Sequence, residues 1–379
     1  MTATVLPSLD SIKAEDWDAL NPSANPFVSY AFLRALEQTN CLGEAHGWYP
    51  QYLCVHDERQ NLIAAAPAYI KTNSYGEFVF DWAWAEAYEK HGLAYYPKLI
   101  VAAPYTPATG PRALIAEDQN AETCIALLLR AADAVVEQHQ LSGVHWLFPE
   151  KDQNDALCTA GKLLPRRGVQ YHWHNHDYQC FDDFLASLNS RKRKNIKRER
   201  RSVEQQGIEL KWYDGCELTR DDWHQVHAFY ASIYERKWGT PSLSPEFFSQ
   251  LGAALPHNSH VVFASVDGER VACSVMYSSK NTLFGRYWGC SQQLHSLHFE
   301  ACYYQGIEYC IRNGLQHFEP GAQGEHKIAR GFLPEYTYSA HRLSEPNFHQ
   351  AIADFLKRET PHVEQQHEHL SDWSPFKKS

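Results

Sequence analysis

The sequence predicts an α/β (α+β) protein made of two domains of similar organisation, each with a mixed sheet flanked by helices. Its 379 residues exceed the usual length of one domain, so two or three domains are expected. Both halves show the same order of elements: a helix, three strands joined by short turns, a second helix and a further strand. We interpret this shared order as a duplication. It places an N-terminal domain at 1–178 and a C-terminal domain at 179–379.

In the first half, alternating apolar residues and polar turns predict a meander of antiparallel strands. The turns are ERQN and TNSYGE. The stretch 83–112 is rich in aromatic residues and proline, which predicts an ordered but irregular loop with one short strand inside. The predicted elements are helix 26–40, strands 51–57, 62–71 and 78–84, helix 121–140 and strand 144–149.

The second half repeats this order. Its second helix is predicted to end at Asn313-Gly314, because glycine adopts the left-handed conformation after a last helical turn without a Cβ penalty. A further helix, 351–370, is predicted near the end of the chain. The other predicted elements are helix 221–237, strands 260–266, 271–279 and 282–289, helix 298–312 and strand 315–318.

The composition is that of a soluble globular protein, with 44% hydrophobic and 21% charged residues. The chain contains no run of about 18 apolar residues, so no membrane-spanning helix is expected. Its beginning lacks the basic and apolar regions of a secretory signal. The ten cysteines are scattered and form no CxxC pair. These observations predict a cytoplasmic protein in a reducing compartment.

Positive charge is concentrated between the two halves. The stretch 190–201 contains eight Lys or Arg and one Glu, a local charge of +7 in a chain whose net charge is −10. A connecting helix at about 182–206 could be merely solvated, or it could bind phosphate, carboxylate or an RNA backbone. We favour the anion site, formed by Arg191, Lys192, Arg193, Lys194, Lys197 and Arg198.

A polar loop follows the predicted strand 315–318. A strand, a helix, a second strand and then a polar loop are typical of a ligand site at the carboxyl ends of strands, although an ordinary solvated loop would show the same pattern. Glu300, at the start of helix 298–312, either stabilises the helix N-terminus or serves as a general base. The polar residues of the loop are Glu319, Gln323, His326, Lys327 and Arg330.

Several common chemistries find no motif in the sequence. There is no GxSxG, P-loop or dinucleotide fingerprint. His172, His174 and His176 alternate along a predicted strand and could ligate zinc, yet no acidic or cysteine partner stands at a recognisable spacing. We therefore expect neither a metal nor a tightly bound cofactor.

Three long stretches carry a family resemblance: SRKRKNIKRERR, HFEACYYQGIEYCIRNG and FEPGAQGEHKIARGFLP in the second half. The first-half stretch FDWAWAEAYEKHGLAYYPKLIVAAPYTPATGPR belongs with them. Together they resemble the Fem-type acyltransferase-like family of bacterial proteins, described as peptidoglycan biosynthesis/recognition proteins or N-acyltransferases. The resemblance covers nearly the whole chain.

The resemblance implies two tandem GNAT-like acyltransferase domains. Fem-type relatives transfer an aminoacyl group from an aminoacyl-tRNA to an amine, whereas ordinary GNAT enzymes use acyl-CoA. The GNAT pyrophosphate loop, Q/R-x-x-G-x-G/A, would lie between Gly289 and His298, where this chain has CSQQLHSL and no glycine. That difference disfavours acetyl-CoA and leaves aminoacyl-tRNA or acyl-CoA as the donor co-substrate.

The predicted function is therefore N-acyl transfer by direct attack of a small-molecule or peptide amine on an activated acyl group. Glu300 or His326 is the predicted base, and Lys327 and Arg330 would bind a donor phosphate or an acceptor carboxylate. The alternatives are a non-catalytic module that binds peptidoglycan precursors and an RNA-binding protein. The residues predicted to line the groove are Arg286, Trp288, Tyr303 and Gln323 from the second half, and Trp84, Tyr88, Tyr96, Lys98 and Arg112 from the first.

Overall fold

The computed structural model describes residues 1–235 and 239–377, and the chain forms two compact units. Unit 1 comprises Met1–Val169 and Tyr336–Gln366, and unit 2 comprises Gln170–Glu335 and His367–Ser379. The chain leaves unit 1 within strand β9 and returns to it within strand β15. The sequence prediction assigned every residue after 178 to the second domain. The structure corrects this for 336–366, because β15 pairs with β8 of unit 1.

Unit 1 contains two sets of paired strands. Strands β1, β3, β4 and β7 form one antiparallel sheet. Strands β2, β5, β6, β8 and β15 pair in that order, with β6 and β8 parallel. The predicted strand 62–71 is divided into β4 and β5 at Pro67, which cannot donate a ladder hydrogen bond. The bounds are β1 Thr2–Leu6, β2 Trp48–Pro50, β3 Tyr52–His56, β4 Leu62–Ala66, β5 Ala68–Lys71, β6 Lys98–Val101, β7 Leu114–Ile115, β8 Gly143–Leu147, β9 Leu164–His174 and β15 Leu333–Leu343.

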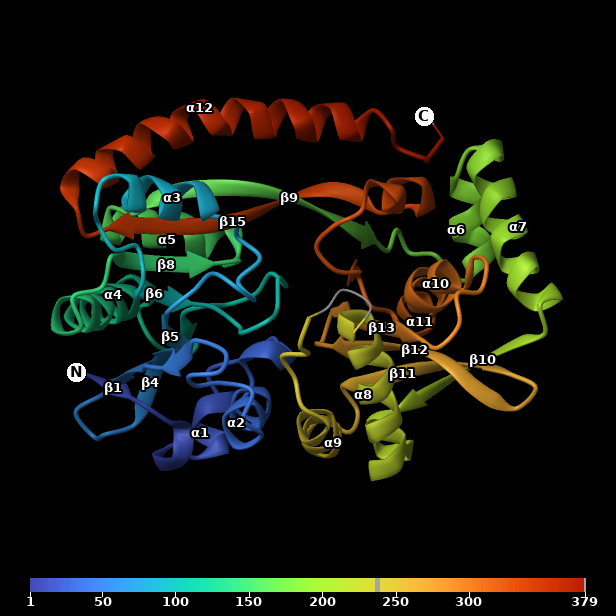
Figure 1. Cartoon of the computed structure of the whole chain (residues 1–379), viewed down its shortest axis with the longest axis horizontal. Helices are drawn as coiled ribbons and strands as arrows, with labels where there is room; N and C mark the ends of the chain where they lie inside the picture. The colour runs from blue at the N-terminus through green and yellow to red at the C-terminus, as the bar shows by residue number, and fades with distance from the viewer. Residues whose placement is uncertain (236–238, 378–379) are drawn as a thin grey trace. The chain divides into compact units, whose positions relative to one another are not determined.

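Helix α4 provides much of the core of unit 1. Its residues Cys124, Leu128 and Val135 lie on one face and are buried against the sheets. Asn120 begins the helix by accepting a hydrogen bond from the Thr123 amide. The helices are α1 Ala14–Asp18, α2 Tyr30–Gln38, α3 Trp82–Lys90, α4 Ala121–Gln138 and α5 Lys151–Gly161, the 3-10 turns are η1 Leu9–Ser11 and η2 Pro26–Val28, and α12 spans Pro346–Ser371 (Figure 1).

The predicted strand 78–84 is wrong, because the chain forms a loop there and then helix α3. Aromatic residues alternate along this stretch, which is the period of a strand. Trp84 and Tyr88, four residues apart, instead pack as one helical face against Ile352 and Leu356 of α12. The stretch 83–112, predicted as an irregular loop with one strand, thus contains most of α3 as well as strand β6.

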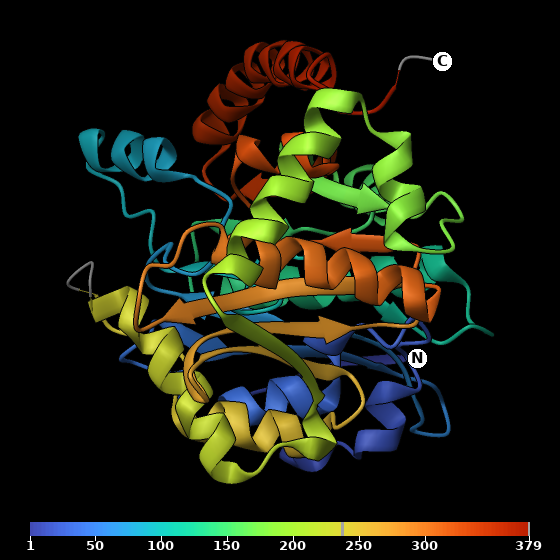
Figure 2. The same cartoon turned by 90° about the vertical axis from the view of Figure 1, so that its right-hand side faces the viewer.

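Unit 2 is built on strands β10, β11, β12, β13, β14 and the end of β9, in that order. All neighbours are antiparallel except β13 and β14, which are parallel. Helix α8 covers one face of this sheet and helix α11 covers the other (Figures 1 and 2). The bounds are β10 Ile208–Asp214, β11 Ser259–Val266, β12 Glu269–Ser278, β13 Thr282–Cys290, β14 His317–Glu319, α6 Phe181–Ser187, α7 Ser190–Gln205, α8 Arg220–Glu235, α9 Pro245–Ala254, α10 Leu297–Phe299, α11 Gln305–Asn313, η3 Gly215–Glu217, η4 Glu300–Tyr304 and η5 Glu325–Arg330.

Two predicted helices of this unit differ in detail from the structure. The basic connecting helix, predicted over 182–206, is two helices, because Asn189 caps a new one by accepting a hydrogen bond from the Lys192 amide at 3.0 Å. The predicted helix 298–312 contains a π-helical segment, η4, between α10 and α11. The last two residues of the predicted helix 221–237 lie outside the described residues.

Candidate functional site

A cavity of about 290 Å³ in unit 2 gathers the polar residues of the predicted loop. The cavity lies beside β13 and at the end of β14. These two strands are the only parallel pair among the described residues of unit 2. Six residues predicted to act in the site line it together: Arg286, Trp288, Tyr303, Gln323, His326 and Lys327. The other lining residues are Ser274, Gly285, Tyr287, His298, Cys302, Pro320, Gly321 and Ala322.

Two local features shape this cavity. The π-helical segment Glu300–Tyr304 inserts an extra residue into the helical turn, and such segments are frequent at functional sites. It allows Cys302 and Tyr303 to line the cavity. On the opposite side, Gly285 permits a close approach of the loop after β14, because a Cβ there would lie 3.2 Å from the Pro320 Cα. A larger residue at 285 would therefore narrow the cavity.

Tyr303 and His326 form a hydrogen-bonded pair in the cavity, with 3.0 Å between the Tyr303 hydroxyl and His326 Nε2. Burial lowers the pKa of His326, and the charges of Arg330 and Lys327 lower it further. Burial raises the pKa of Tyr303. A neutral imidazole beside a protonated phenol can accept the phenolic proton, so the pair has the properties of a general base with a relay.

Lys327 carries positive charge into the same cavity. Its side chain is 3% exposed, and Nζ donates a hydrogen bond to the Gly321 carbonyl at 2.6 Å. Burial lowers the pKa of this lysine to about 8. The ammonium is therefore mostly charged at neutral pH, although it lies in an environment that disfavours the charge.

Sequence reasoning missed eight of the lining residues, among them His298, Cys302 and Ser274. His298 comes from α10, Cys302 from the π-helical segment and Ser274 from β12. Burial lowers the pKa of His298 to about 4 and raises that of Cys302 to about 12, so both are uncharged at neutral pH. His298 stands two residues before Glu300 and one helical turn before Cys302, and this spacing is the signal that could have identified it.

A second cavity, of about 540 Å³, adjoins the first and shares Trp288 and His298 with it. The rings of these two residues meet edge to face at 5.4 Å between centroids. The stretch CSQQLHSL, where the sequence lacks a glycine-rich loop, supplies much of the lining. The residues are Ile233, Trp288, Cys290, Gln292, Gln293, Leu294 and His298.

Glu300 lies outside the residues that line either cavity. Its carboxylate accepts hydrogen bonds from Arg200 Nε at 3.1 Å and from Gln305 Nε2 at 2.9 Å. Burial raises the pKa of Glu300, and the Arg200 charge opposes this. These contacts describe a carboxylate that ties the π-helical segment to α7.

Arg330 is likewise used inside the fold. Its guanidinium pairs with Glu199 of α7, with Nη2 to Oε1 at 2.7 Å, and Nη1 donates to the His326 carbonyl at 2.7 Å. It also stacks on the Phe299 ring at 3.4 Å from the centroid. Arg330 thus links the turn that contains His326 to Glu199 of α7, and these contacts position the turn.

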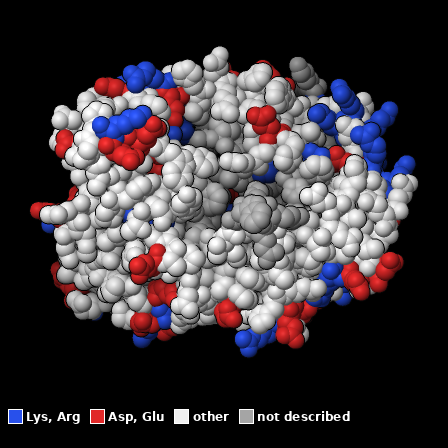
Figure 3. Space-filling view, in the orientation of Figure 1, with Lys and Arg blue, Asp and Glu red and all other residues white. Residues whose placement is uncertain are grey.

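The basic residues of α7 divide between two faces. Glu199, Arg200 and the apolar Ile196 and Val203 contact the rest of unit 2, whereas most of the predicted anion-binding residues point toward solvent. Basic side chains cluster over this helix in the space-filling view (Figure 3). Of the six, Lys197 lies 3.6 Å from Asp182, and for the other five no carboxylate of the described residues lies within ion-pair distance.

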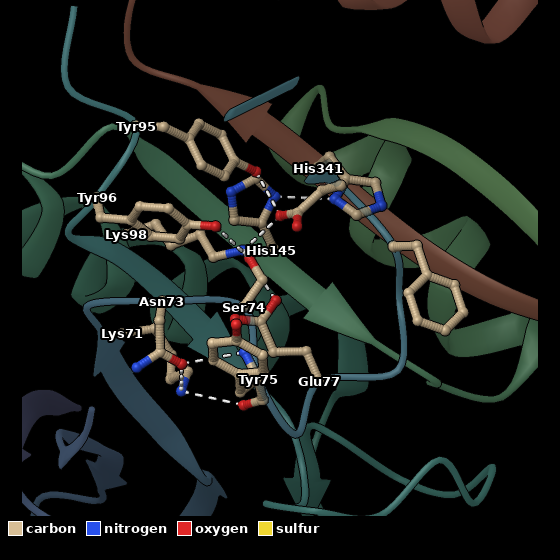
Figure 4. Close-up of polar contacts among 12 residues, drawn as sticks. Lys71, Asn73, Ser74, Tyr75, Glu77, Tyr95, Tyr96, Lys98, His145 and His341 are labelled. Carbon is tan, nitrogen blue, oxygen red and sulfur yellow. Dashed lines mark hydrogen bonds and ion pairs between the residues drawn. The ribbon is translucent and has the colours of Figure 1, made fainter. Parts of the chain in front are cut away.

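Lys98 and Tyr96 belong to a buried polar cluster in unit 1 (Figure 4). Lys98 is fully buried, and its Nζ donates to Glu77 Oε2 at 2.8 Å, to Ser74 Oγ at 2.9 Å and to Asp81. The Tyr96 hydroxyl bonds Ser74 Oγ at 2.8 Å. The two carboxylates raise the pKa of Lys98 against the effect of burial. The positive charge of Lys98 is therefore balanced by Glu77 and Asp81 within the cluster.

The remaining first-half predictions also have partners inside unit 1. Trp84 and Tyr88 lie in the apolar cluster described above. Arg112 is 1% exposed and donates to the carbonyls of Leu147 and Ala108, at 2.7 and 2.6 Å. These contacts hold the loop before β7 in place.

Of the three alternating histidines, His172 and His174 lie in β9 and contact other side chains, whereas His176 follows the end of the strand. His174 contacts His317 at 3.0 Å and Glu335 at 2.9 Å, and burial lowers the pKa of His172 to about 3. Within 1–235 and 239–377, no group of three or more His, Cys, Asp or Glu is arranged to hold a metal ion. In the same residues, no helix has the length and apolar character needed to cross a bilayer.

The fold is shared with solved structures of low sequence identity. FemX matches with 10% identity and a TM-score of 0.56, over 93% of this chain and 100% of that chain. The C-terminal domain of a putative lysylphosphatidylglycerol synthetase from Agrobacterium fabrum matches with 10% identity and a TM-score of 0.52, over 90% and 96%. L-PGS from Bacillus licheniformis matches with 11% identity and a TM-score of 0.50, over 86% and 96%. The predicted fold class, mixed sheets flanked by helices in an α/β protein, is confirmed.

The sequence then defines the family within this fold. Residues 8–378 match the model of the FemAB-like family, whose description is peptidoglycan biosynthesis/recognition. The chain belongs to this family, as its resemblance in sequence predicted. A comparison with curated proteins gave no match.

Proposed function

We propose that this protein is an N-acyltransferase that moves an aminoacyl group from an aminoacyl-tRNA to an amine, without a covalent enzyme intermediate. The Tyr303–His326 pair, with 3.0 Å between the hydroxyl and Nε2 in the 290 Å³ cavity, is the observation that carries this proposal. Membership of the FemAB-like family supports acyl or aminoacyl transfer in general. The choice of tRNA over acyl-CoA rests on the basic face of α7.

In the proposed reaction, the lone pair of a neutral amine attacks the acyl carbonyl carbon and forms the new N–C bond. The attacking nitrogen then loses a proton to the Tyr303 oxygen while Tyr303 passes its own proton to His326 Nε2. The guanidinium of Arg286 and the Gln323 amide line the cavity and would stabilise the negative charge on the carbonyl oxygen. When the C–O bond to the ribose breaks, the leaving oxygen takes the proton from His326.

The donor would bind across two features of unit 2. The basic residues of α7 would contact the RNA backbone, since Lys and Arg neutralise phosphates without reading sequence. The ester-linked end would occupy the 540 Å³ cavity, where Trp288 offers a face for stacking and Gln292 and Gln293 offer amides. Trp288 and His298 line both cavities, so the acyl group would pass beside them.

The test is a transfer assay with radiolabelled aminoacyl-tRNA and, separately, acetyl-CoA, against a panel of amines. We expect transfer from charged tRNA that His326→Gln reduces at least a hundredfold without a change in tRNA binding. Transfer from acetyl-CoA and not from charged tRNA would show that the donor is an acyl-CoA. Binding of tRNA or of peptidoglycan precursors by the wild-type protein, with no transfer from either donor, would identify a non-catalytic binding protein instead.

A further inference from the structure

Lys327 is a buried cation whose partner among the described residues is a neutral carbonyl. We propose that the acceptor amine carries a carboxylate, and that Lys327 binds this carboxylate in the 290 Å³ cavity. The substrate class is an amino acid, or the end of a peptide, in which the amine and the carboxylate lie close together. This inference rests on the proposed function, because it deepens the assignment of that cavity to the acceptor.

The contacts of Lys327 leave two of its three N–H donors for a ligand. An ammonium has three N–H donors, and one of them reaches the Gly321 carbonyl at 2.6 Å. The backbone around it is fixed, since the Lys327 amide donates to the Gly324 carbonyl at 2.9 Å. The side chain, at 3% exposure, therefore faces the cavity with two donors to spare.

The charge of Lys327 is not balanced by its described surroundings. Among the described residues, the cavity lining contains no Asp or Glu, and Lys327 forms no ion pair. Cys302, His298 and His326 are neutral at neutral pH, for the reasons given above. A buried charge is favourable only when it is paired, so an anion supplied by the substrate would complete this site.

Arg286 adds a second cation to the same lining. A planar guanidinium binds carboxylates and phosphates in a two-pronged geometry, whereas an ammonium acts as a point charge. The proposed reaction assigns this guanidinium to the carbonyl oxygen, so Lys327 is the cation that would bind the acceptor carboxylate. The cavity volume of about 290 Å³ lies at the lower end of ligand pockets, which suits an amino acid better than a nucleotide.

The position of Lys327 next to His326 connects the anion to the amine. The attacking amine must come within hydrogen-bond reach of Tyr303, which is paired with His326. An anion on Lys327, the next residue of the same turn, must then lie close to that amine. A carboxylate on the acceptor meets this condition directly, whereas a donor phosphate would have to share the acceptor cavity.

The experiment measures binding of matched ligand pairs by ligand-observed NMR at pH 7, in the absence of donor. The pairs are L-alanine with L-alaninamide, and Nα-acetyl-L-lysine with Nα-acetyl-L-lysinamide, which differ only in the carboxylate. We expect the acid of at least one pair to bind about tenfold more tightly than its amide. Lys327→Met should reduce this preference to less than twofold, and Lys327→Arg should retain it.

Lys280→Met serves as the matched control, because Lys280 is exposed in the turn between β12 and β13 of the same unit. Equal binding of acid and amide in both pairs would overturn the proposal. So would inorganic phosphate binding that Lys327→Met abolishes while no carboxylate binds, since the subsite would then belong to a donor phosphate. Because no donor is present, a carboxylate preference without any transfer activity would contradict the proposed function and leave this binding site established.

Discussion

Glu199 of the basic helix α7 is linked through Arg330 to the backbone of His326. Its carboxylate accepts from Arg330 Nη2 at 2.7 Å and from Nε at 3.2 Å, and Arg330 Nη1 donates to the His326 carbonyl at 2.7 Å. The next residue of α7, Arg200, holds Glu300 and Glu308. One face of α7 therefore fixes both the 3-10 turn and the π-helical segment that line the cavity, while its other face presents the cations.

We predict that Glu199→Gln destabilises unit 2 and slows transfer. The change removes the charge of a hydrogen-bonded ion pair, and such bonds contribute about 1.5–3 kcal/mol. The free energy of unfolding in urea should fall by that amount. Glu204→Gln, an exposed change on the same helix, is the control and should leave it unaltered. Equal stability of the two variants would show that the Glu199–Arg330 pair does not hold the turn.

The Tyr303–His326 pair gives the second prediction. His326→Gln should lower the transfer rate by about 10²- to 10⁴-fold, the range for loss of a general base, and Tyr303→Phe should lower it less because water can take the place of the relay. Single-turnover kinetics with prebound donor would measure the chemical step. The exposed His139→Gln is the control. A normal rate in His326→Gln would exclude this histidine as the base.

The pH dependence of the site should have two limbs. The pKa of His326 is lowered from its usual 6.5, so the base is neutral above that pKa and transfer is lost as the pH falls through it, below pH 6.5. The pKa of Lys327 is about 8, so its charge, and with it carboxylate binding, is lost as the pH rises through 8. Lys327→Arg should abolish the alkaline limb of the binding profile, because arginine keeps its charge. An unchanged alkaline limb in that variant would assign it to another group.

Donor binding should depend steeply on salt through the outer face of α7. Replacing Arg191, Lys194 and Arg198 with Gln should weaken tRNA binding and reduce the slope of log K against log salt by up to about 3, one unit for each lost phosphate contact. The control replaces Lys13, Lys151 and Lys280 with Gln, which changes the net charge equally at exposed positions elsewhere. If both triple variants lose the same affinity, net charge rather than α7 governs binding.

The sequence predicted best those lining residues of the candidate site that stand next to a strand in the sequence. Gln323, His326 and Lys327 lie in the loop that follows strand β14, and they line the cavity. Strand β14 is parallel to β13, and ligand sites are common at the carboxyl ends of parallel strands. Arg286 and Trp288 lie on the adjacent strand β13 and reach the same cavity. The strand period alone does not place them there, because Gly285 and Tyr287 also line the cavity and the register shifts beside them.

Contacts between distant segments could not be predicted in this way. Glu300 and Arg330 have the residue types of a base and an anion binder, yet Arg200 and Glu199, more than ninety residues earlier, bind them. The sequence gives no sign of this pairing, because both partners lie in a helix read as a uniform basic stretch. The alternating aromatic residues from Phe78 to Trp84 misled for the same reason, since Trp84 packs against α12, which lies far along the chain.

Lys98 is expected to stabilise the buried polar cluster of unit 1 through its two carboxylate partners. Lys98→Met would leave the carboxylates of Glu77 and Asp81 buried without their cation, and breaking such a pair costs about 3–5 kcal/mol. The free energy of unfolding in urea should fall by this amount, whereas Lys90→Met, which alters an exposed pair with Glu86, should leave the unfolding midpoint unchanged. Combining Lys98→Met with Glu77→Gln and Asp81→Asn should restore part of the loss, because no unpaired charge would remain. If Lys98→Met alone leaves stability unchanged but weakens acceptor binding, Lys98 serves a ligand rather than the fold, as the sequence first suggested.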